Sequence, residues 1–440
     1  MSATDTIYAL ASGAAAGAVA LLRLSGPGSA EAVRRLAGGL PPPRHASLRK
    51  LRAADGEILD HALVLWFPSP ASYTGEDAAE FHLHGGRSVV AGVMEALAAV
   101  GLRPAEPGEF TRRAFLHGKM DLTAAEGIAD LIAAETAAQR RQALHQASGG
   151  LARLYGGWAE HLARLLAHQE AAIEFAEDGL PSDLDARARA GAGELRAEIK
   201  AHLADARRGE LLREGLVFAI IGAPNAGKSS LLNALVGREA AIVSARAGTT
   251  RDIVEVRLDL AGIPVTLCDT AGLREAGDEI EAEGIRRAER RADEAQLVIT
   301  IFAADKPPDA ETLRWVRPEA LVLVNKCDLL ARPAEIGGRP AMAVSALEGT
   351  GLDALRILLA EAALRLAGLG EGNQLTRPRH RAILTEAAAL LADAEAAILP
   401  ELTAEALRAA LFALGRLTGR VGVEEILDIV FRDFCIGKQC

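Results

Sequence analysis

A glycine-rich loop directly after an apolar run constrains the fold of this chain more than any other segment. Gly222 to Ser229 reads G-A-P-N-A-G-K-S and follows the apolar residues 216–221. Such a loop needs a strand before it and a helix after it, because backbone N–H groups and the positive end of the helix must converge on one anion. The pattern predicts that Lys228 reaches the β- and γ-phosphates and that the Ser229 hydroxyl ligates Mg²⁺, in a helix opening at Ser229 and Ser230. The ligand expected here is a nucleoside triphosphate.

Three further apolar runs each end in a polar motif. Residues 265–268 run into Asp269-Thr270-Ala271-Gly272, where Asp269 would hold the Mg²⁺ shell and the Gly272 amide would sense the γ-phosphate. The third motif, Asn325-Lys326-Cys327-Asp328, places a carboxylate where it would accept two hydrogen bonds from guanine. Adenine lacks this donor pair and would leave the carboxylate unpaired. The fourth run ends in Ser345-Ala346, where a backbone amide would meet guanine O6. The four motifs together indicate GTP.

The segment 244–252 supplies further candidates for this site. Thr250 is the expected second Mg²⁺ ligand. Arg246 and Arg251 are candidate arginine fingers, although their interpretation as surface residues is favoured.

The position that orients the attacking water differs from that of Ras-like GTPases, which have a glutamine there. This chain has Leu273, so either hydrolysis is slow or a polar group in 274–281 takes the role, with a solvated acidic loop as the alternative. The residues expected to contact GTP are Asn225, Ala226, Gly227, Lys228, Ser229, Ser230, Ser244, Thr249, Thr250, Asp269, Thr270, Ala271, Gly272, Asn325, Lys326, Asp328, Ser345 and Ala346.

The chain of 440 residues is too long for one ordinary domain. Its residue composition and hydrophobic periodicity also change along the sequence. Short apolar runs punctuated by Gly and Pro give way to long Ala, Leu, Glu and Arg periodicity, then to strand–helix alternation, then to helical sequence again. We therefore expect a multidomain fold. It has an α+β N-terminal domain (1–118), a helical domain in two halves (119–212 and 372–440) and an inserted Ras-like α/β P-loop G domain (213–371).

Charge and composition limit the classes of protein. The net charge of −10 argues against non-specific coating of nucleic acid. The four cysteines form no C-x-x-C pair, so we expect no zinc site or disulfide framework. The uncharged segment 6–22 is interpreted as a loop between strands at 7–10 and 19–22, not as a signal peptide. With no run of about 20 apolar residues elsewhere, a cytoplasmic protein without membrane contact is expected.

Several motifs together resemble the MnmE (TrmE) family of tRNA modification GTPases, over essentially the whole chain. Other GTPases share only the G-domain group, so the combination is specific. The motifs are Ser72-Tyr73-Thr74-Gly75-Glu76-Asp77, His84-Gly85-Gly86, Pro107-Gly108-Glu109-Phe110-Thr111, Pro224-Asn225-Ala226-Gly227-Lys228-Ser229, Gly248-Thr249-Thr250-Arg251-Asp252, Asp269-Thr270-Ala271-Gly272-Leu273-Arg274-Glu275, Thr418-Gly419-Arg420-Val421 and Phe434-Cys435-Ile436-Gly437-Lys438.

The resemblance implies a K⁺ ion beside the phosphates. Its ligands would be Asn225, Ser244, Arg246 and Thr249, while a turn-forming role after Pro224 is the alternative for Asn225 from sequence alone. The resemblance also implies that Glu281 is the catalytic residue that orients water. In the family, G domains pair across a homodimer.

The resemblance further implies that the N-terminal domain binds a tetrahydrofolate derivative of the 5-formyl or methylene type. Arg23, Glu80, Lys119 and Lys438 fall on the family's folate-contacting positions. From sequence alone all four are ordinary surface charges. Ala14-Ala15-Ala16 departs from the family's Gly-Arg-Gly-Gly run, which removes an arginine near the folate site. Cys435 matches a near-terminal cysteine of the family, for which inert packing is favoured.

The function implied is GTP-dependent modification of tRNA. With an FAD- and NADH-dependent partner of the MnmG (GidA) type, in a heterotetramer, the protein would form a 5-carboxymethylaminomethyl- or aminomethyl-type group on the wobble uridine. Candidate tRNA contacts are Arg112-Arg113 and 377–381, although a solvated face or a helix start is favoured for each. The alternative function is a ribosome-assembly or regulatory GTPase without modification activity.

Overall fold

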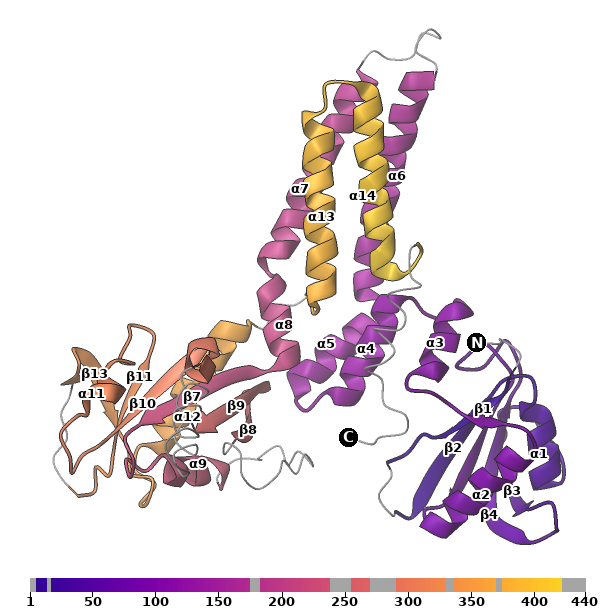
Figure 1. The fold of residues 1–440 in the computed structure, drawn as a ribbon, viewed down its shortest axis with the longest axis horizontal. Coiled ribbons are helices and arrows are strands. Elements are labelled where there is room, and N and C mark those ends of the chain that lie inside the picture. The colour runs from indigo at the N-terminus through magenta and orange to yellow at the C-terminus, as the bar shows by residue number, and fades with distance from the viewer. Residues whose placement is uncertain are drawn as a thin grey trace, which may run out of the picture. The chain divides into compact units, whose positions relative to one another are not determined.

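The computed structural model describes residues 5–13, 17–174, 183–237, 255–269, 290–329, 335–368 and 374–421. It separates into two compact units, Met1–Ala129 with Gly415–Cys440 and Asp130–Leu414. Figure 1 shows a first sheet with its helices, a group of long helices and a second sheet with its own helices. The domain boundaries expected at 118, 212 and 371 stay predictions.

The first unit is built on a six-stranded sheet in the order β3-β4-β5-β2-β1-β6. Neighbouring strands are antiparallel except β1 and β6. The strands expected at 7–10 and 19–22 are confirmed as β1 and the start of β2. The elements are β1 (Ile7–Leu10), β2 (Val19–Ser25), α1 (Ser29–Ala37), β3 (Ser47–Arg52), β4 (Ile58–Phe67), β5 (Ala78–His84), α2 (Arg87–Ala99), β6 (Arg103–Pro104) and α3 (Glu109–Leu116). The helix α4 (Leu122–Ala133) begins in this unit, and its last residues, from Asp130 onward, belong to the second unit.

Alternation along β2 and β5 gives this sheet two different faces. Leu22 and Leu24 of β2 pack with Phe81 of β5 in the core, together with residues of α1 and α2. The intervening Arg23 and Glu80 therefore lie on the opposite face, because successive side chains of a strand alternate. One face is the core, and the other carries the charged residues expected to bind a ligand.

The second unit contains a seven-stranded sheet in the order β12-β13-β11-β10-β7-β9-β8. The strands β13, β11, β10, β7 and β9 are parallel, and β8 and β12 are antiparallel edges. The elements are β7 (Leu216–Gly222), α9 (Lys228–Val236), β8 (Glu255–Leu260), β9 (Ile263–Asp269), β10 (Leu297–Ala303), α11 (Ala310–Leu313), β11 (Leu321–Asn325), β12 (Glu335–Ile336), β13 (Arg339–Ala343) and α12 (Leu352–Ala367).

The strand order of this sheet reverses at β7. The chain continues from β7 to β8 and β9 on one side, whereas β10, β11 and β13 extend the other side. Open α/β sheets bind ligands at such a switch point, beyond the carboxyl ends of the strands. The glycine-rich loop follows β7 and therefore lies at this point.

Long helices form the rest of the second unit. Two of them, α7 and α13, pack along each other, as do α6 and α7 (Figure 1). The helix start expected near Arg377 is confirmed, because Arg377 is the N-cap of α13 and Pro378 occupies its first turn. None of the helices that the structure describes is long and apolar enough to cross a membrane. The remaining helices are α5 (Ala137–Ala147), α6 (Gly150–Glu174), α7 (Leu184–Ala204), α8 (Ala206–Glu214), α13 (Pro378–Ala396) and α14 (Pro400–Thr418).

Candidate functional site

The loop after β7 needs its two glycines for different reasons. At Gly222 an added Cβ would lie 2.5 Å from the carbonyl oxygen of Ile301 on β10. At Gly227 it would lie 2.1 Å from Nδ2 of Asn325, and this residue has a φ of +93° as the N-cap of α9. A side chain at Gly222 would push the backbones of β7 and β10 apart, and one at Gly227 would displace the Asn325 side chain and strain the left-handed backbone. The loop is thus packed against two neighbouring strands while its N–H groups open at the start of a helix.

Lys228 bends back over the loop that precedes it. Its Nζ donates to the carbonyl oxygens of Gly222 and Ala223, at 2.8 and 2.9 Å, and the residue is 5% exposed. An ammonium held in this way lies inside the turn of the loop. It is positioned where an anion cradled by the loop would need a cation.

The expected Mg²⁺ ligands from two motifs meet at the carboxyl edge of the sheet. The Ser229 hydroxyl, in the first turn of α9, donates to Oδ2 of Asp269 at 3.3 Å. Asp269 ends β9 and is 3% exposed. A hydroxyl and a carboxylate are hard oxygen ligands of the kind Mg²⁺ uses together with substrate phosphates. The residues therefore fit a Mg²⁺–triphosphate complex.

Asn325, at the end of β11, joins the first motif to the fourth. Its Nδ2 donates to the carbonyl oxygen of Ala226 at 2.9 Å, and its Oδ1 accepts from the amide of Ala346 at 3.1 Å. The side chain is buried, so both polar ends need these partners. Asn325 therefore fixes the phosphate loop relative to the loop expected to meet guanine.

The other expected residues of the third and fourth motifs differ in exposure and in their partners. Lys326 has a φ of +62°, and its Nζ lies 3.1 Å from Oδ2 of Asp305. The hydrogen bond from Lys326 holds the pKa of the Asp305 carboxyl below its usual value. Asp328 is exposed. The buried Ser345 hydroxyl accepts from the amide of Glu348 within its own turn. The sequence analysis missed Asp305. It could have been found as a carboxylate two residues after the end of an apolar strand, β10.

Asn225 has the backbone conformation of the turn-forming role, and its role as a K⁺ ligand stays a prediction. It has a φ of +66°, a left-handed conformation that asparagine tolerates in turns, and its side chain is exposed. Ser230 is exposed in the first turn of α9. The other expected residues lie outside the described residues, namely Ser244, Arg246, Thr249, Thr250, Arg251, Thr270, Ala271, Gly272, Leu273, Glu281, Cys435 and Lys438.

Cys268, next to Asp269, is not set up for thiolate chemistry. The thiol is buried, and burial together with the Glu255 carboxylate raises its pKa to about 11. Cys268 and Cys327 are free cysteines. A protonated buried thiol is a packing residue.

A separate cavity of about 360 Å³ opens in the first unit, on the sheet face opposite the core. Three of the four residues expected to bind folate line it together, although they come from β2, β5 and the segment after α3. Its volume is in the range of small-molecule sites. The lining residues are Arg23, Arg44, Phe67, Ala71, Ser72, Tyr73, Thr74, Ala78, Glu80, Phe110 and Lys119.

Arg23 and Glu80 are directly opposite each other on antiparallel β2 and β5. The Arg23 Nε donates to Glu80 Oε1 at 2.9 Å, and its guanidinium lies 5.5 Å from the centre of the Tyr73 ring. Sequence reasoning missed Arg44 and Phe67, which come from a distant loop and strand. It also gave no role to Tyr73 and Phe110, although both lie in quoted motifs. Cations, one carboxylate and three aromatic rings share this cavity.

Two family models match the chain. The model described as "GTP-binding protein TrmE N-terminus" matches residues 6–119, and the model described as "MnmE helical domain" matches residues 122–435. The chain belongs to the MnmE family. The second match spans the seven-stranded sheet, which we call the G domain because it carries the glycine-rich loop, Asp269 and the Asn325 motif at its strand ends. The expected multidomain fold class is confirmed.

Relatives called tRNA modification GTPase MnmE match nearly end to end. That of Gluconacetobacter diazotrophicus is 57% identical over 98% of this chain and 98% of its own length. That of Paramagnetospirillum magneticum is 54% identical over 99% of this chain and its full length. A crystal structure of the G domain of the T. maritima FeoB iron transporter is 24% identical over 34% of this chain and 98% of that chain. Its TM-score of 0.26 is too low to carry a structural argument.

Two of the N-terminal MnmE motifs meet in one buried ion network. Glu109 accepts hydrogen bonds from Arg103 and Arg113, and Arg113 also pairs with Glu76 and Asp5. Burial opposes ionisation of Glu109, but hydrogen bonds from both arginines outweigh burial and hold its pKa below the usual value. Arg113 is 7% exposed and surrounded by carboxylates. For Arg113, the candidate tRNA contact and the favoured solvated face are therefore both wrong, because carboxylates neutralise this cation inside the fold.

Proposed function

We propose that this MnmE-family protein hydrolyses GTP and, with an FAD- and NADH-dependent partner of the MnmG type, modifies the wobble uridine of tRNA. The product would carry a 5-carboxymethylaminomethyl- or aminomethyl-type group. The observation that carries the proposal is that one chain combines two sites. One is the phosphate loop tied to Asp269 and Asn325, and the other is the cavity of Arg23 and Glu80. A regulatory GTPase would use the first site and would leave the second without a purpose.

The GTPase residues divide the work of binding and charge stabilisation. Lys228 and the loop amides would hold the β- and γ-phosphates, while Ser229, Thr250 and Asp269 would hold Mg²⁺, which neutralises charge developing on the phosphates. Glu281 would orient the attacking water, since Leu273 has no polar group. A K⁺ ion on Asn225, Ser244, Arg246 and Thr249 would add positive charge in place of an arginine finger. Hydrolysis compared in KCl and NaCl tests this cation, and equal rates would leave Asn225 only its turn-forming role.

Guanine selectivity is assigned to Asp328, whose carboxylate is exposed at the end of the Asn325–Asp328 motif. Asp328→Asn should weaken GTP binding about 30-fold, because an amide N–H₂ would replace one carboxylate oxygen, face a guanine donor and leave both groups unpaired. Xanthosine triphosphate, with a carbonyl in place of the amine, should bind the variant better than it binds the wild type. Competition titrations against a fluorescent GTP analogue measure both. Asp309→Asn, an N-cap change on α11, is the matched control. Unchanged nucleotide preference would exclude the assignment.

The cavity of the first unit fits a tetrahydrofolate. The rings of Tyr73, Phe67 and Phe110 suit the flat pterin, while Arg44 and Lys119 suit the glutamate carboxylates. Glu80 would accept from ring donors through Oε2, because Oε1 already accepts from Arg23. Lys438 is a further proposed contact. The folate would supply the one-carbon unit of the new uridine group.

Calorimetry of the full chain with 5-formyltetrahydrofolate tests this site. Lys119→Met keeps the alkyl stem and should weaken binding about tenfold, because it removes one charge-assisted hydrogen bond. Lys50→Met, on exposed β3 and away from the cavity, should bind like the wild type. No heat from the wild type would mean that residues 14–16, which lack the family's arginine, do not permit a site. Equal affinity of Lys119→Met would exclude Lys119 as a contact.

The whole proposal is tested by nucleoside analysis of tRNA from a strain lacking the gene. Unmodified wobble uridine, restored by the wild-type chain and only with the flavin-dependent partner present, is the expected result. Fully modified tRNA in the deletion strain would favour a regulatory or ribosome-assembly GTPase. Cytoplasmic action, a homodimer paired through G domains and a heterotetramer with the partner complete the proposal. Light scattering with and without GTP analogue and K⁺ tests the pairing.

A further inference from the structure

The chain passes twice between the helical region and the G domain. The entry segment is α8 itself, residues 206–214, which leads into β7, and the exit segment, residues 374–377, leads into α13. The two segments contact each other directly, because an added Cβ on Gly209 would lie 2.2 Å from the carbonyl oxygen of Leu375. Both covalent connections between the G domain and the helices run through these segments, so a movement of the G domain relative to the helices must act on them.

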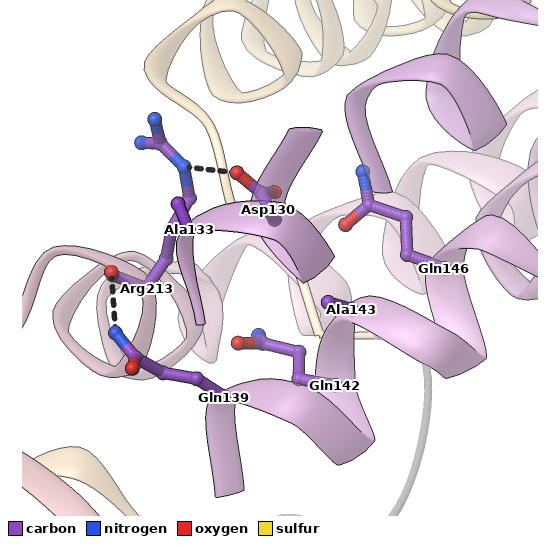
Figure 2. A pocket seen from close by; sticks show the side chains of 7 residues that line it. All are labelled: Asp130, Ala133, Gln139, Gln142, Ala143, Gln146 and Arg213. Carbon is purple, nitrogen blue, oxygen red and sulfur yellow. Dashed lines mark hydrogen bonds and ion pairs between the residues drawn. The ribbon is translucent and has the colours of Figure 1, made fainter. Parts of the chain in front are cut away.

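Asp130, near the end of α4, holds both segments through one oxygen. Its Oδ1 accepts from Arg213 Nε at 3.0 Å and from Arg377 Nη2 at 2.7 Å. Figure 2 shows the bond from Arg213 to Asp130 at the edge of a small cavity. The side chains of Asp130 and Arg377 are only 14% and 16% exposed, so solvent screens this pair poorly. A single carboxylate thus joins residues that lie 164 positions apart in sequence (377 − 213).

Two glutamines of α5 repeat this arrangement. Gln139 Nε2 donates to the carbonyl oxygen of Arg213 at 3.0 Å, as Figure 2 also shows. Gln146 Oε1 accepts from the Thr376 hydroxyl at 3.0 Å, and Thr376 is buried. Each segment therefore has one ion pair to Asp130 and one hydrogen bond to α5. We call this group, Asp130 with Gln139 and Gln146, the clamp.

The beginning of α5 also contacts the G domain itself. Ala138 is part of the hydrophobic core beneath the sheet, and Glu135 forms an ion pair of 2.9 Å with Arg257 on β8. The strand β8 begins at Glu255, shortly after the segment 244–252, which is expected to contain the second Mg²⁺ ligand. A shift of β8 would therefore reach α5 and the clamp through packed groups.

The clamp has room for a second arrangement. Asp130 Oδ2 and Gln142 Nε2 are buried and have no hydrogen-bond partner among the described residues. Both residues line a cavity of about 90 Å³, together with Gln139, Gln146 and Arg213. An arginine could exchange Oδ1 for Oδ2 with a small movement. Coupling between sites needs an element with two such discrete states.

We propose that Asp130 is a positioning residue that couples the nucleotide state of the G domain to the helical region. It connects the entry and exit segments, and we call the connected pair the joint. Because the two segments then move together, a movement of the G domain also moves the helices. This inference rests on the proposed function. Asp130 touches neither nucleotide nor tRNA and acts through Arg213 and Arg377.

Asp130→Asn removes the charge and keeps the shape of the side chain. We expect GTP hydrolysis within about twofold of the wild type, while modified uridine formed per GTP hydrolysed falls about tenfold, a usual size for coupling between sites. Arg377→Gln, which frees only the exit segment, should lower the same ratio. Glu170→Gln, which breaks the exposed Glu170–Arg408 pair on the helices, is the matched control and should leave it unchanged. A purely structural role would lower both rates together and keep the ratio.

An unchanged ratio in Asp130→Asn, or a ratio kept while both rates fall, would overturn the proposal. If the wild-type chain modifies no tRNA, the proposed function fails. The role of Asp130 is then tested by measuring distances between the G domain and the helices. Spin labels on α12 and α6 then report the change between GDP and a GTP analogue. Asp130→Asn should broaden the distance distribution in both states. A distribution and a nucleotide-dependent change identical to those of the wild type would overturn the joint.

Discussion

Replacing Asp269 with asparagine is expected to lower the rate of GTP hydrolysis about 100-fold or more, with a higher Mg²⁺ requirement. The carboxylate is 3% exposed at the end of β9 and lies 3.3 Å from the Ser229 hydroxyl. Asparagine fills the same volume but removes the negative charge that would balance Mg²⁺ in a site poorly screened by water. Single-turnover hydrolysis over a range of MgCl₂ concentrations measures the loss.

Asp259→Asn is the matched control for this substitution. Asp259 lies near the end of β8 in the same sheet and accepts from the Gly262 amide in a turn, a role that asparagine keeps. We expect hydrolysis by this variant within about twofold of the wild type, as usual for a change outside the site. A similar loss in both variants would mean that Asp269 acts on the stability of the sheet. Full activity of Asp269→Asn at low Mg²⁺ would remove Asp269 from the metal site.

The strand ends of the G domain could be predicted from sequence because each motif directly follows an apolar run and requires a particular local backbone conformation. A glycine-rich loop after an apolar run has few structural solutions, so β7 and α9 could be predicted from residues close together in the chain. The contact of Gly222 with Ile301 could not be predicted. It depends on β10 lying beside β7, which is a matter of strand order and not of local pattern.

The same limit applies to Asn325 and to the cavity. The Asn325 motif predicted contact with guanine, but its bonds to Ala226 and Ala346 join three loops that meet only in the folded sheet. Arg23, Glu80 and Lys119 were predicted only through a resemblance, since each alone is an ordinary surface charge. Their common cavity depends on the pairing of β2 with β5 and on the segment after α3.

Charge counting failed at Arg113 for a physical reason. Two adjacent arginines in a sequence suggest a basic surface. In the structure, however, three carboxylates at positions 5, 76 and 109 neutralise Arg113. Whether a cation is solvated or buried depends on these distant partners. The same holds for Asp130, whose two arginines lie 83 and 247 positions away.

Glu109→Gln should destabilise the first unit by about 3 kcal/mol at pH 7, because it leaves buried cations short of one carboxylate. Glu109 is 3% exposed and accepts from Arg103, Arg113 and the Glu106 amide. Its pKa is held below the usual value in the folded state. Its stabilising effect is therefore complete above the unfolded-state pKa of about 4.3 and is lost as the pH falls through the folded-state pKa. Between pH 5 and pH 3, roughly, the wild type should lose more stability than the variant.

Urea unfolding of the full chain across this pH range, with hydrogen exchange to locate the change, measures both effects. The exchange should rise in β1, β6 and α3, which surround the network, and stay unchanged in the G domain. Glu31→Gln is the matched control, because Glu31 pairs with Arg35 on the exposed face of α1 and solvent screens that pair. Burial raises the pKa of the Asp5 carboxyl, but hydrogen bonds from Arg103 and Arg113 lower it further than burial raises it, so the variant should keep part of the acid sensitivity. Equal stability of Glu109→Gln and Glu31→Gln would mean that the buried arginines do not depend on Glu109, and that the two motifs meet there without supporting the fold.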